Sequence, residues 1–254
     1  MSSFDDRLPM RPLVNFVNRR KLAQCEDCGG RHQGLCGVLS DEDLTFLAGI
    51  TTCMVISAGA TFIEEGAPVN SCYSINEGHV RLFKSLPDGR RQIIGFANSG
   101  HFLGLGPTES AFSAEAMDTI KVCRFNRVAL LAAFKEFPAL EHRLLEVTMH
   151  ELAIAQQQML LLGRKTSVER VATFLLAWAE RQNICAPGAL PKPQSVLTLP
   201  LSRMDLADYL GLTIETVSRS LSQLKRDGLI GIPNIHDIVL VRPQALVEIA
   251  EAVQ

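Results

Sequence analysis

Three cysteines near the start of the chain are spaced closely enough to bind one metal centre together. Cys25, Cys28 and Cys36 form a C-x2-C-x7-C pattern, with glycines between and beside them. Because glycine lets the backbone wrap tightly, three thiolates in such a segment can converge on one metal centre. His32 lies inside the pattern, so a zinc site of three thiolates and one imidazole is a competing interpretation. The alternative without a function is an ordinary surface loop whose cysteines bind no metal.

The cysteine count also indicates a redox compartment. The chain has seven cysteines among 254 residues. An odd number in a long chain argues against a disulfide scaffold and favours free, metal-bound or reactive thiols in a reducing compartment. Residues 1–21 are basic but contain no continuous apolar run, so they do not resemble a signal peptide. No stretch reaches the ~18 apolar residues of a membrane span. We therefore expect a cytoplasmic protein.

Length, composition and charge exclude several classes of protein. The length suggests one large domain or two modest ones. A hydrophobic fraction of 47% is enough for packed cores and excludes global disorder. The net charge of −2 and the pI of about 6.3 exclude a generally basic protein that coats nucleic acid. Any contact with DNA must therefore come from a local patch.

The pattern of apolar, polar and turn-forming residues changes along the chain. Residues 1–40 are polar and cysteine-dense, which is typical of an arm. Between residues 41 and 130, short apolar runs at 73–75, 80–83 and 92–96 alternate with turn residues. Strands at this spacing predict a small antiparallel barrel or roll. Asp88-Gly89 lies between two of the runs and predicts a hairpin turn.

A long helix is predicted within residues 131–163, because residues 139–162 contain neither glycine nor proline. Its apolar residues fall on two faces: Leu145, Met149, Leu152 and Met159 on one, and Leu140, Leu144, Val147, Ile154 and Leu161 on the other. Such a helix must pack on both sides. One face can lie on the roll and the other against a second copy of the helix. The alternative is a fully buried core helix in a monomer.

Residues 202–228 predict a helix, a turn and a second helix. Ser202 can cap the first helix with Asp205 as its partner, Gly211 supplies the tight turn, and Thr213 can cap the second helix. Val217, Leu221 and Leu224 would bury one face of the second helix, and Glu215, Ser218, Arg219 and Ser222 would point outward. The hairpin of residues 229–241 would form a wing. This region lies within a C-terminal segment of residues 164–254.

The outward side chains suit the recognition of DNA. An arginine such as Arg219 can donate two hydrogen bonds to guanine, Glu215 can accept one from cytosine, and Ser218 can do either. A helix that enters the major groove uses its N-terminal residues in this way. Lys225 and Arg226 then lie where phosphates would run. The alternative is an ordinary helical hairpin with solvated charges.

The segment of residues 205–219 resembles the DNA-binding motif of the CRP/FNR regulators, and its E-x-x-S-R arrangement resembles the FNR branch. The resemblance covers nearly the whole chain. It implies an α+β fold: a cysteine-rich arm (1–40), an antiparallel β-roll of the jelly-roll, cyclic-nucleotide-binding-like type (41–130), a dimerisation helix (131–163) and a winged helix-turn-helix (164–254). It also implies a bacterial homodimer that recognises TTGAT-N4-ATCAA through Glu215, Ser218 and Arg219.

The same resemblance implies a set of cluster ligands. Oxygen-sensing FNR proteins have an N-terminal cysteine cluster and one distant cysteine, and the spacing here is similar to that of the FnrN type. The distant ligand maps to Cys123, so Cys25, Cys28, Cys36 and Cys123 would hold a [4Fe–4S] cluster, with zinc as the alternative. The other three cysteines match no ligand position. We expect Cys53 and Cys72 to be buried in the core and Cys185 to be a candidate for thiol redox control.

One other feature of the family is absent from this sequence, and a second has two equal interpretations. The stretch of residues 102–112 lacks the acid and the arginine with which cyclic-nucleotide-binding members hold the ligand, so nucleotide sensing is not expected. Residues 85–90 resemble the family's loop that contacts RNA polymerase, although an exposed turn is an equal interpretation. The histidines have no nucleophile pattern around them, and no catalytic domain or membrane segment supports an enzyme or a channel regulator. The protein is therefore predicted not to be an enzyme.

The leading prediction is an oxygen-responsive transcriptional regulator that binds DNA as a dimer when its [4Fe–4S] cluster is intact and controls genes for low-oxygen metabolism. The alternative is a CRP-family regulator with a zinc-stabilised or thiol-redox arm that responds to another signal. Residues 152–163 carry no charge, whereas some family members have an acid near Ala155 that opposes dimerisation without the cluster. The cluster-free protein is therefore expected to dimerise more readily.

Overall fold

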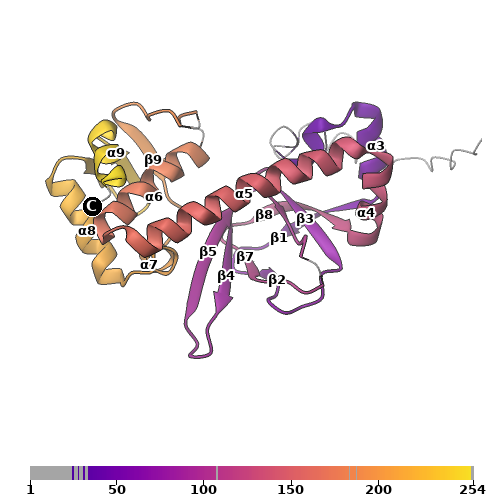
Figure 1. The fold of residues 1–254 in the computed structure, drawn as a ribbon, viewed down its shortest axis with the longest axis horizontal. Helices are drawn as coiled ribbons and strands as arrows, with labels where there is room; N and C mark the ends of the chain where they lie inside the picture. Colours follow the sequence, from indigo (N-terminus) through magenta and orange to yellow (C-terminus); the bar gives the residue numbers. More distant parts are fainter. Residues whose placement is uncertain are drawn as a thin grey trace, which may run out of the picture.

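The computed structural model describes residues 25, 28, 31, 34–106, 108–182, 184–186 and 188–252. In Figure 1 the long helix α5 (Pro138–Arg164) runs across the molecule and joins two lobes. The N-terminal lobe consists mainly of β-strands that lie along part of α5, and the C-terminal lobe of helices and a small sheet lies at its far end. This arrangement confirms the predicted α+β fold.

The N-terminal lobe is a roll of two four-stranded antiparallel sheets. One sheet has the order β1 (Thr51–Ile56), β8 (Ile120–Asn126), β3 (Ser71–Glu77) and β6 (Phe102–Leu103). The other has the order β2 (Thr61–Ile63), β7 (Ser113–Ala116), β4 (Val80–Ser85) and β5 (Arg91–Ala97). Ile75, Val80 and Ile120 are fully buried between the sheets. The predicted hairpin joins β4 to β5, and Gly89 adopts the positive φ of 82° that this turn requires.

Short helices flank the roll and form a second core on one side of it. The helices η1 (Leu35–Val38) and α3 (Asp41–Gly49) precede the roll, and α4 (Arg127–Glu136) follows β8 directly. Leu35, Leu47, Phe125, Leu130 and Leu140 pack together there. Because Phe125 is on β8 and Leu140 is on α5, this core links the sheet to the start of the long helix.

Helix α5 has two different faces, as predicted. Leu140 and Leu161 are buried against the rest of the chain. Four residues of the other face are more than half exposed: Leu145 57%, Met149 63%, Leu152 58% and Met159 65%. The helix begins at Pro138, after a break at Phe137, and ends one residue beyond the predicted stop at Gly163. The predicted segment of residues 131–163 therefore contains the end of α4 as well as α5.

The C-terminal lobe has the predicted winged helix-turn-helix architecture. Its elements are α6 (Ser167–Arg181), β9 (Ser195–Thr198), α7 (Arg203–Leu210), α8 (Ile214–Arg226), β10 (Ile230–Gly231), β11 (Asp237–Leu240) and α9 (Pro243–Glu251). The strands form an antiparallel sheet in the order β10-β11-β9. A capping box formed by Thr166 and Glu169 begins α6.

None of the helices in the described part of the chain combines the length and the apolar character that a membrane-spanning helix needs.

Candidate metal centre and nucleic-acid interface

Local hydrogen bonds position the two helices of the helix-turn-helix. The Ser202 hydroxyl accepts a hydrogen bond from the Asp205 amide at 3.0 Å, and the Asp205 carboxylate accepts one from the Ser202 amide at 3.0 Å. Gly211 ends α7 in the left-handed conformation with a φ of 61°. Thr213 then caps α8 by accepting a hydrogen bond from the Thr216 amide at 3.2 Å. These predicted caps and turn are confirmed, and they fix the angle between α7 and α8.

The side chains of α8 divide between core and solvent as predicted. Val217, Leu221 and Leu224 are at most 2% exposed. The candidate DNA contacts lie on exposed positions: Glu215, Ser218, Arg219, Lys225 and Arg226. Arg219 donates a long hydrogen bond of 3.4 Å to the Thr216 hydroxyl, and this weak contact leaves the guanidinium available.

The charge of Glu215 is set by its position at the start of α8. Its own backbone amide and the Thr213 side chain donate hydrogen bonds that lower the pKa of Glu215, and the nearby Arg219 lowers it further. The carboxylate is therefore ionised at neutral pH and can accept a hydrogen bond from a base. The helix presents one anionic and one cationic group side by side.

The roll holds α7 through an ion-pair network that we call the interdomain clasp: Arg81, Arg91, Glu115, Asp205 and Asp208. Arg81 reaches Asp205 at 2.7 Å and also pairs with Glu115. Arg91 lies 3.3 Å from both Asp205 and Asp208. Burial alone would raise the pKa of Asp205, but hydrogen bonds from Ser202 and the charges of the two arginines hold it below its usual value.

Aromatic packing completes this junction between the lobes. The ring of Phe96 on β5 lies 5.1 Å from that of Tyr209 on α7 and 5.5 Å from that of Trp178 on α6. Gln158 on α5 donates a hydrogen bond to the Tyr209 carbonyl at 3.0 Å. No sequence signal marks these partners, because each contact joins residues that are more than fifty positions apart. The helix-turn-helix is therefore held in a defined orientation on the roll.

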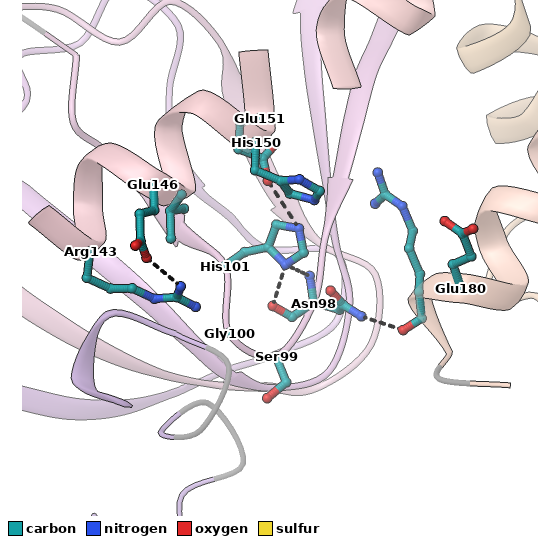
Figure 2. Close-up of a pocket in the computed structure, with 11 residues that line it drawn as sticks. Asn98, Ser99, Gly100, His101, Arg143, Glu146, His150, Glu151 and Glu180 are labelled. Carbon is teal, nitrogen blue, oxygen red and sulfur yellow. Dashed lines mark hydrogen bonds and ion pairs between the residues drawn. The ribbon is translucent and has the colours of Figure 1, made fainter. Parts of the chain in front are cut away.

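A pocket of about 290 Å³ lies beside this junction, between the turn of residues 98–101, α5 and the end of α6 (Figure 2). His101 lies 3.5 Å from Glu151 of α5, and Asn98 donates a hydrogen bond to the Arg181 carbonyl at 3.5 Å. Burial lowers the pKa of His101, although the charge of Glu151 opposes the shift. The imidazole is therefore neutral at pH 7.

The three N-terminal cysteines lie near one another. The Cys28 amide donates a long hydrogen bond of 3.5 Å to the Cys25 carbonyl. Cys36 lies on η1, which packs against α5. Burial, with smaller contributions from the thiols of Cys28 and Cys25, raises the pKa of the Cys36 thiol to about 12, and Arg31 opposes this rise. A thiol in this setting becomes a thiolate only when a cation compensates its charge, as a metal does.

The fourth predicted ligand, Cys123, lies on β8 close to a second thiol. Its Sγ atom is 3.4 Å from that of Cys53 on β1, and Asn76 donates a hydrogen bond to it at 3.2 Å. The contact with Cys53 and burial both raise the pKa of Cys123, Asn76 lowers it, and Cys28 contributes a further rise.

The other cysteines differ from one another. Cys72 is fully buried, as predicted, and its thiol donates a hydrogen bond to the Gly104 carbonyl at 3.2 Å. The prediction for Cys53 is wrong, because this residue is exposed on an outer strand of its sheet. Cys185 is half-buried in the C-terminal lobe. His32, the proposed zinc ligand, lies outside the described residues.

The donor set fits a thiolate-bound metal centre in chemistry. Four sulfur donors suit an iron–sulfur cluster or zinc, and Cys36 and Cys123 pack on the same apolar core. Within the described residues, no three His, Cys, Asp or Glu side chains are already arranged around one metal position.

Comparisons with known proteins agree with this architecture. Residues 169–249 match a Crp-like helix-turn-helix domain, and residues 54–137 match a cyclic nucleotide-binding domain. The nitrogen fixation regulation protein FixK of Bradyrhizobium diazoefficiens is 41% identical over 88% of this chain and 92% of its own. The transcriptional activator protein FnrL of Cereibacter sphaeroides is 36% identical over 89% of this chain and 92% of its own. The structure of FixK2 from Bradyrhizobium japonicum superposes with a TM-score of 0.72, at 37% identity over 81% of this chain and all of that one.

Proposed function

Since this chain belongs to the CRP/FNR family of DNA-binding transcriptional activators, we propose that it activates genes for low-oxygen metabolism in response to oxygen. Its relatives are regulators and not enzymes, and the exposed face of α8 supplies the groups that contact DNA. One observation supports an oxygen signal most directly: Cys36 and Cys123, which lie in distant parts of the sequence, pack on the same apolar core.

In this proposal Cys25, Cys28, Cys36 and Cys123 hold a [4Fe–4S] cluster. The bound cluster supplies reactivity toward oxygen. The protein itself connects the cluster ligands to the long helix. Cys123 lies on β8, which continues into α4 and then α5. Cys36 lies on η1, which packs directly against α5. Ligation of both segments therefore ties the arm to the beginning of the long helix, and release of the arm loosens that connection.

The exposed face of α5 is the proposed dimer interface. Leu145, Met149, Leu152 and Met159 repeat at spacings of four, three and seven residues, as apolar positions of a coiled coil do. A second copy of α5 would cover them and place two α8 helices for a two-fold palindrome. Because residues 152–163 carry no charge, we expect air-exposed protein to remain partly dimeric. A purely monomeric species in sedimentation at micromolar concentration would contradict this expectation.

The proposed DNA target is TTGAT-N4-ATCAA. Arg219 would donate to guanine, Glu215 would accept from cytosine, and Ser218 would contact a neighbouring base, while Lys225 and Arg226 neutralise phosphates. The hairpin between β4 and β5 presents residues 85–90, of which Asp88 and Arg90 form an exposed ion pair at 2.7 Å. We include RNA polymerase as the proposed partner of this hairpin.

A second candidate is a CRP-type regulator whose cysteine arm is zinc-stabilised or controlled by thiol oxidation. The short distance of 3.4 Å between the sulfurs of Cys53 and Cys123 favours the thiol-redox form. Because both cysteines lie on the roll, the protein would then respond to oxidants through this pair and without an iron–sulfur cluster.

Anaerobic purification separates the two candidates. We expect a coloured protein with iron and sulfide in equal amounts, and a Cys28→Ser variant that loses both the colour and anaerobic binding to the palindrome. Cys185→Ser is the matched control, because it removes a thiol far from the arm and should change neither. A colourless, zinc-loaded wild-type protein, or full DNA binding by Cys28→Ser, would refute the cluster.

A further inference from the structure

We propose that Cys53 and Cys123 form a reversible disulfide in the cluster-free protein, which makes Cys53 an oxidation site that controls a ligand of the metal centre. The consequence for the cluster depends on the function proposed above, because it requires Cys123 to be a ligand. Formation of the disulfide itself does not depend on that function.

The register of the sheet brings the two thiols together. Cys53 on β1 and Cys123 on β8 are direct partners across an antiparallel pair of strands. Opposed residues in such a pair have Cα atoms about 4.5–5.5 Å apart, within the 4.4–6.8 Å range that disulfides span. Their Sγ atoms already lie 3.4 Å apart. Side-chain rotation alone can therefore close the bond, without movement of the strands.

The two thiols differ in exposure in the way that an oxidation pair requires. Cys53 is exposed, whereas Cys123 is partly covered by the core next to α3 and η1. Sensor cysteines are typically accessible and lie beside a second cysteine that resolves the oxidised form. Cys72 on the neighbouring strand is a poor competitor, because it is fully buried and its thiol is bonded to the Gly104 carbonyl.

The reaction with a peroxide balances in two steps. The Cys53 thiolate attacks one oxygen of hydrogen peroxide, so that an S–O bond forms, the O–O bond breaks, and hydroxide leaves and takes up the thiol proton as water. The Cys123 thiol then attacks the Cys53 sulfur and gives up its proton as it does so, the S–S bond forms, and the second hydroxide leaves with that proton as water. Two thiols are oxidised to one disulfide, and the peroxide is reduced to two waters.

The disulfide would remove one of the four proposed cluster ligands. A protein that has lost its cluster to an oxidant could not rebuild it until a thiol reductant releases Cys123. Brief exposure to oxygen and stronger oxidative stress would then leave the regulator in two different states, one ready for reassembly and one locked.

Peptide mapping tests the disulfide directly. Metal-free full-length protein is treated under argon with an equimolar amount of hydrogen peroxide, alkylated, and digested with a protease that cuts after Asp and Glu. Cleavage at Asp43, Glu64, Asp118 and Glu136 places Cys53 in residues 44–64 and Cys123 in residues 119–136, each as the only cysteine. We expect these two peptides to be joined, and dithiothreitol to separate them.

Two variants serve as controls. Cys53→Ser should lose the joined peptide and leave Cys123 open to alkylation after peroxide, while Cys185→Ser should form the joined peptide as the wild type does. Because the Cys53 side chain lies on a strand, Cys53→Val should give the same result with a good strand former in its place. A melting curve for each variant confirms that it is folded.

The absence of the joined peptide in the wild type would overturn the proposal, and so would a dominant bond between Cys123 and either Cys28 or Cys36. Iron and sulfide assays on the anaerobic preparation are made separately. If the protein is colourless but still forms the disulfide, the cluster proposal fails and the disulfide proposal stands. The two proposals are therefore tested independently.

Discussion

The two ends of the molecule are built in different ways. The helix-turn-helix comes from one contiguous segment whose caps, turn and apolar positions all lie within 25 residues, from Ser202 to Arg226. The thiol site combines Cys25 from the arm, Cys36 from η1 and Cys123 from β8. Cys53 lies beside Cys123 only because of the register between β1 and β8. Helix α5 connects the two ends (Figure 1). A contiguous site keeps its shape by itself, whereas a dispersed site depends on the fold and can be opened by chemistry.

This difference explains what could be predicted from the sequence. Ser202, Gly211 and Thr213 act on neighbours within a few residues, so their roles follow from local hydrogen-bonding rules. The sidedness of α5 and α8 follows from helical periodicity in the same way. The turn at Gly89 follows from the conformational freedom of glycine.

The remaining features depend on contacts between distant residues. Cys53 lies on a short strand whose exposure pattern does not alternate regularly, so its exposure could not be inferred from its neighbours. Asp205 and Asp208, the partners of Arg81 and Arg91 on α7, lie more than a hundred residues away in the sequence. Ion pairs between residues so far apart in the sequence cannot be predicted from the local sequence pattern.

The largest effect on DNA binding is expected at the proposed dimer interface on the exposed face of α5, which we call the dimer seam. Leu152→Glu places like charges against each other across the two-fold axis. Two such side chains lose burial worth about 1.5–3 kcal/mol each. We expect dissociation in sedimentation experiments and a loss of binding to the full palindrome. Gln157→Glu, which adds the same charge to an exposed position of α5 away from the seam, should keep the dimer. A dimeric Leu152→Glu protein would show that α5 is not the interface.

The interdomain clasp should give the next largest effect. Arg81→Met leaves Glu115 and the 5% exposed Asp205 side chain with only Arg91 as a cation. We expect the free energy of unfolding to fall by roughly 2–3 kcal/mol, somewhat less than the loss of a fully buried partner causes. Urea titration measures this change. Lys121→Met, which removes the exposed pair with Glu77, should have little effect. Equal stability of the two variants would mean that the clasp does not hold the lobes together.

Base recognition at α8 should respond locally. Arg219→Ala should cost about 1–3 kcal/mol in binding and relax specificity at one base pair. Lys225→Ala should instead weaken all sequences alike and reduce the salt dependence of binding. Binding titrations against single-base variants of the palindrome distinguish the two effects. An unchanged site preference in Arg219→Ala would contradict the role given to this residue.

The smallest expected effect is the pH dependence of the junction in Figure 2. Burial lowers the pKa of His101 below its ordinary 6.5, so the folded protein binds fewer protons than the unfolded one. Its contribution to stability is complete above pH 6.5 and is lost as the pH falls below that value. His101→Gln should therefore reduce the loss of stability between pH 7.5 and 5.5, while the exposed His142→Gln should not. Identical pH profiles for His101→Gln and the wild type would exclude this contribution.

The central claim is that an intact cluster is needed for tight binding to DNA. The most direct test measures the binding of one anaerobic sample to a fluorescent TTGAT-N4-ATCAA duplex, before and after a measured exposure to air. We expect the affinity to fall about tenfold or more, or at least about 1.4 kcal/mol, in parallel with the loss of visible absorbance and of acid-labile sulfide. Unchanged affinity after the absorbance has disappeared, or high affinity in a preparation that never contained iron and sulfide, would contradict the account.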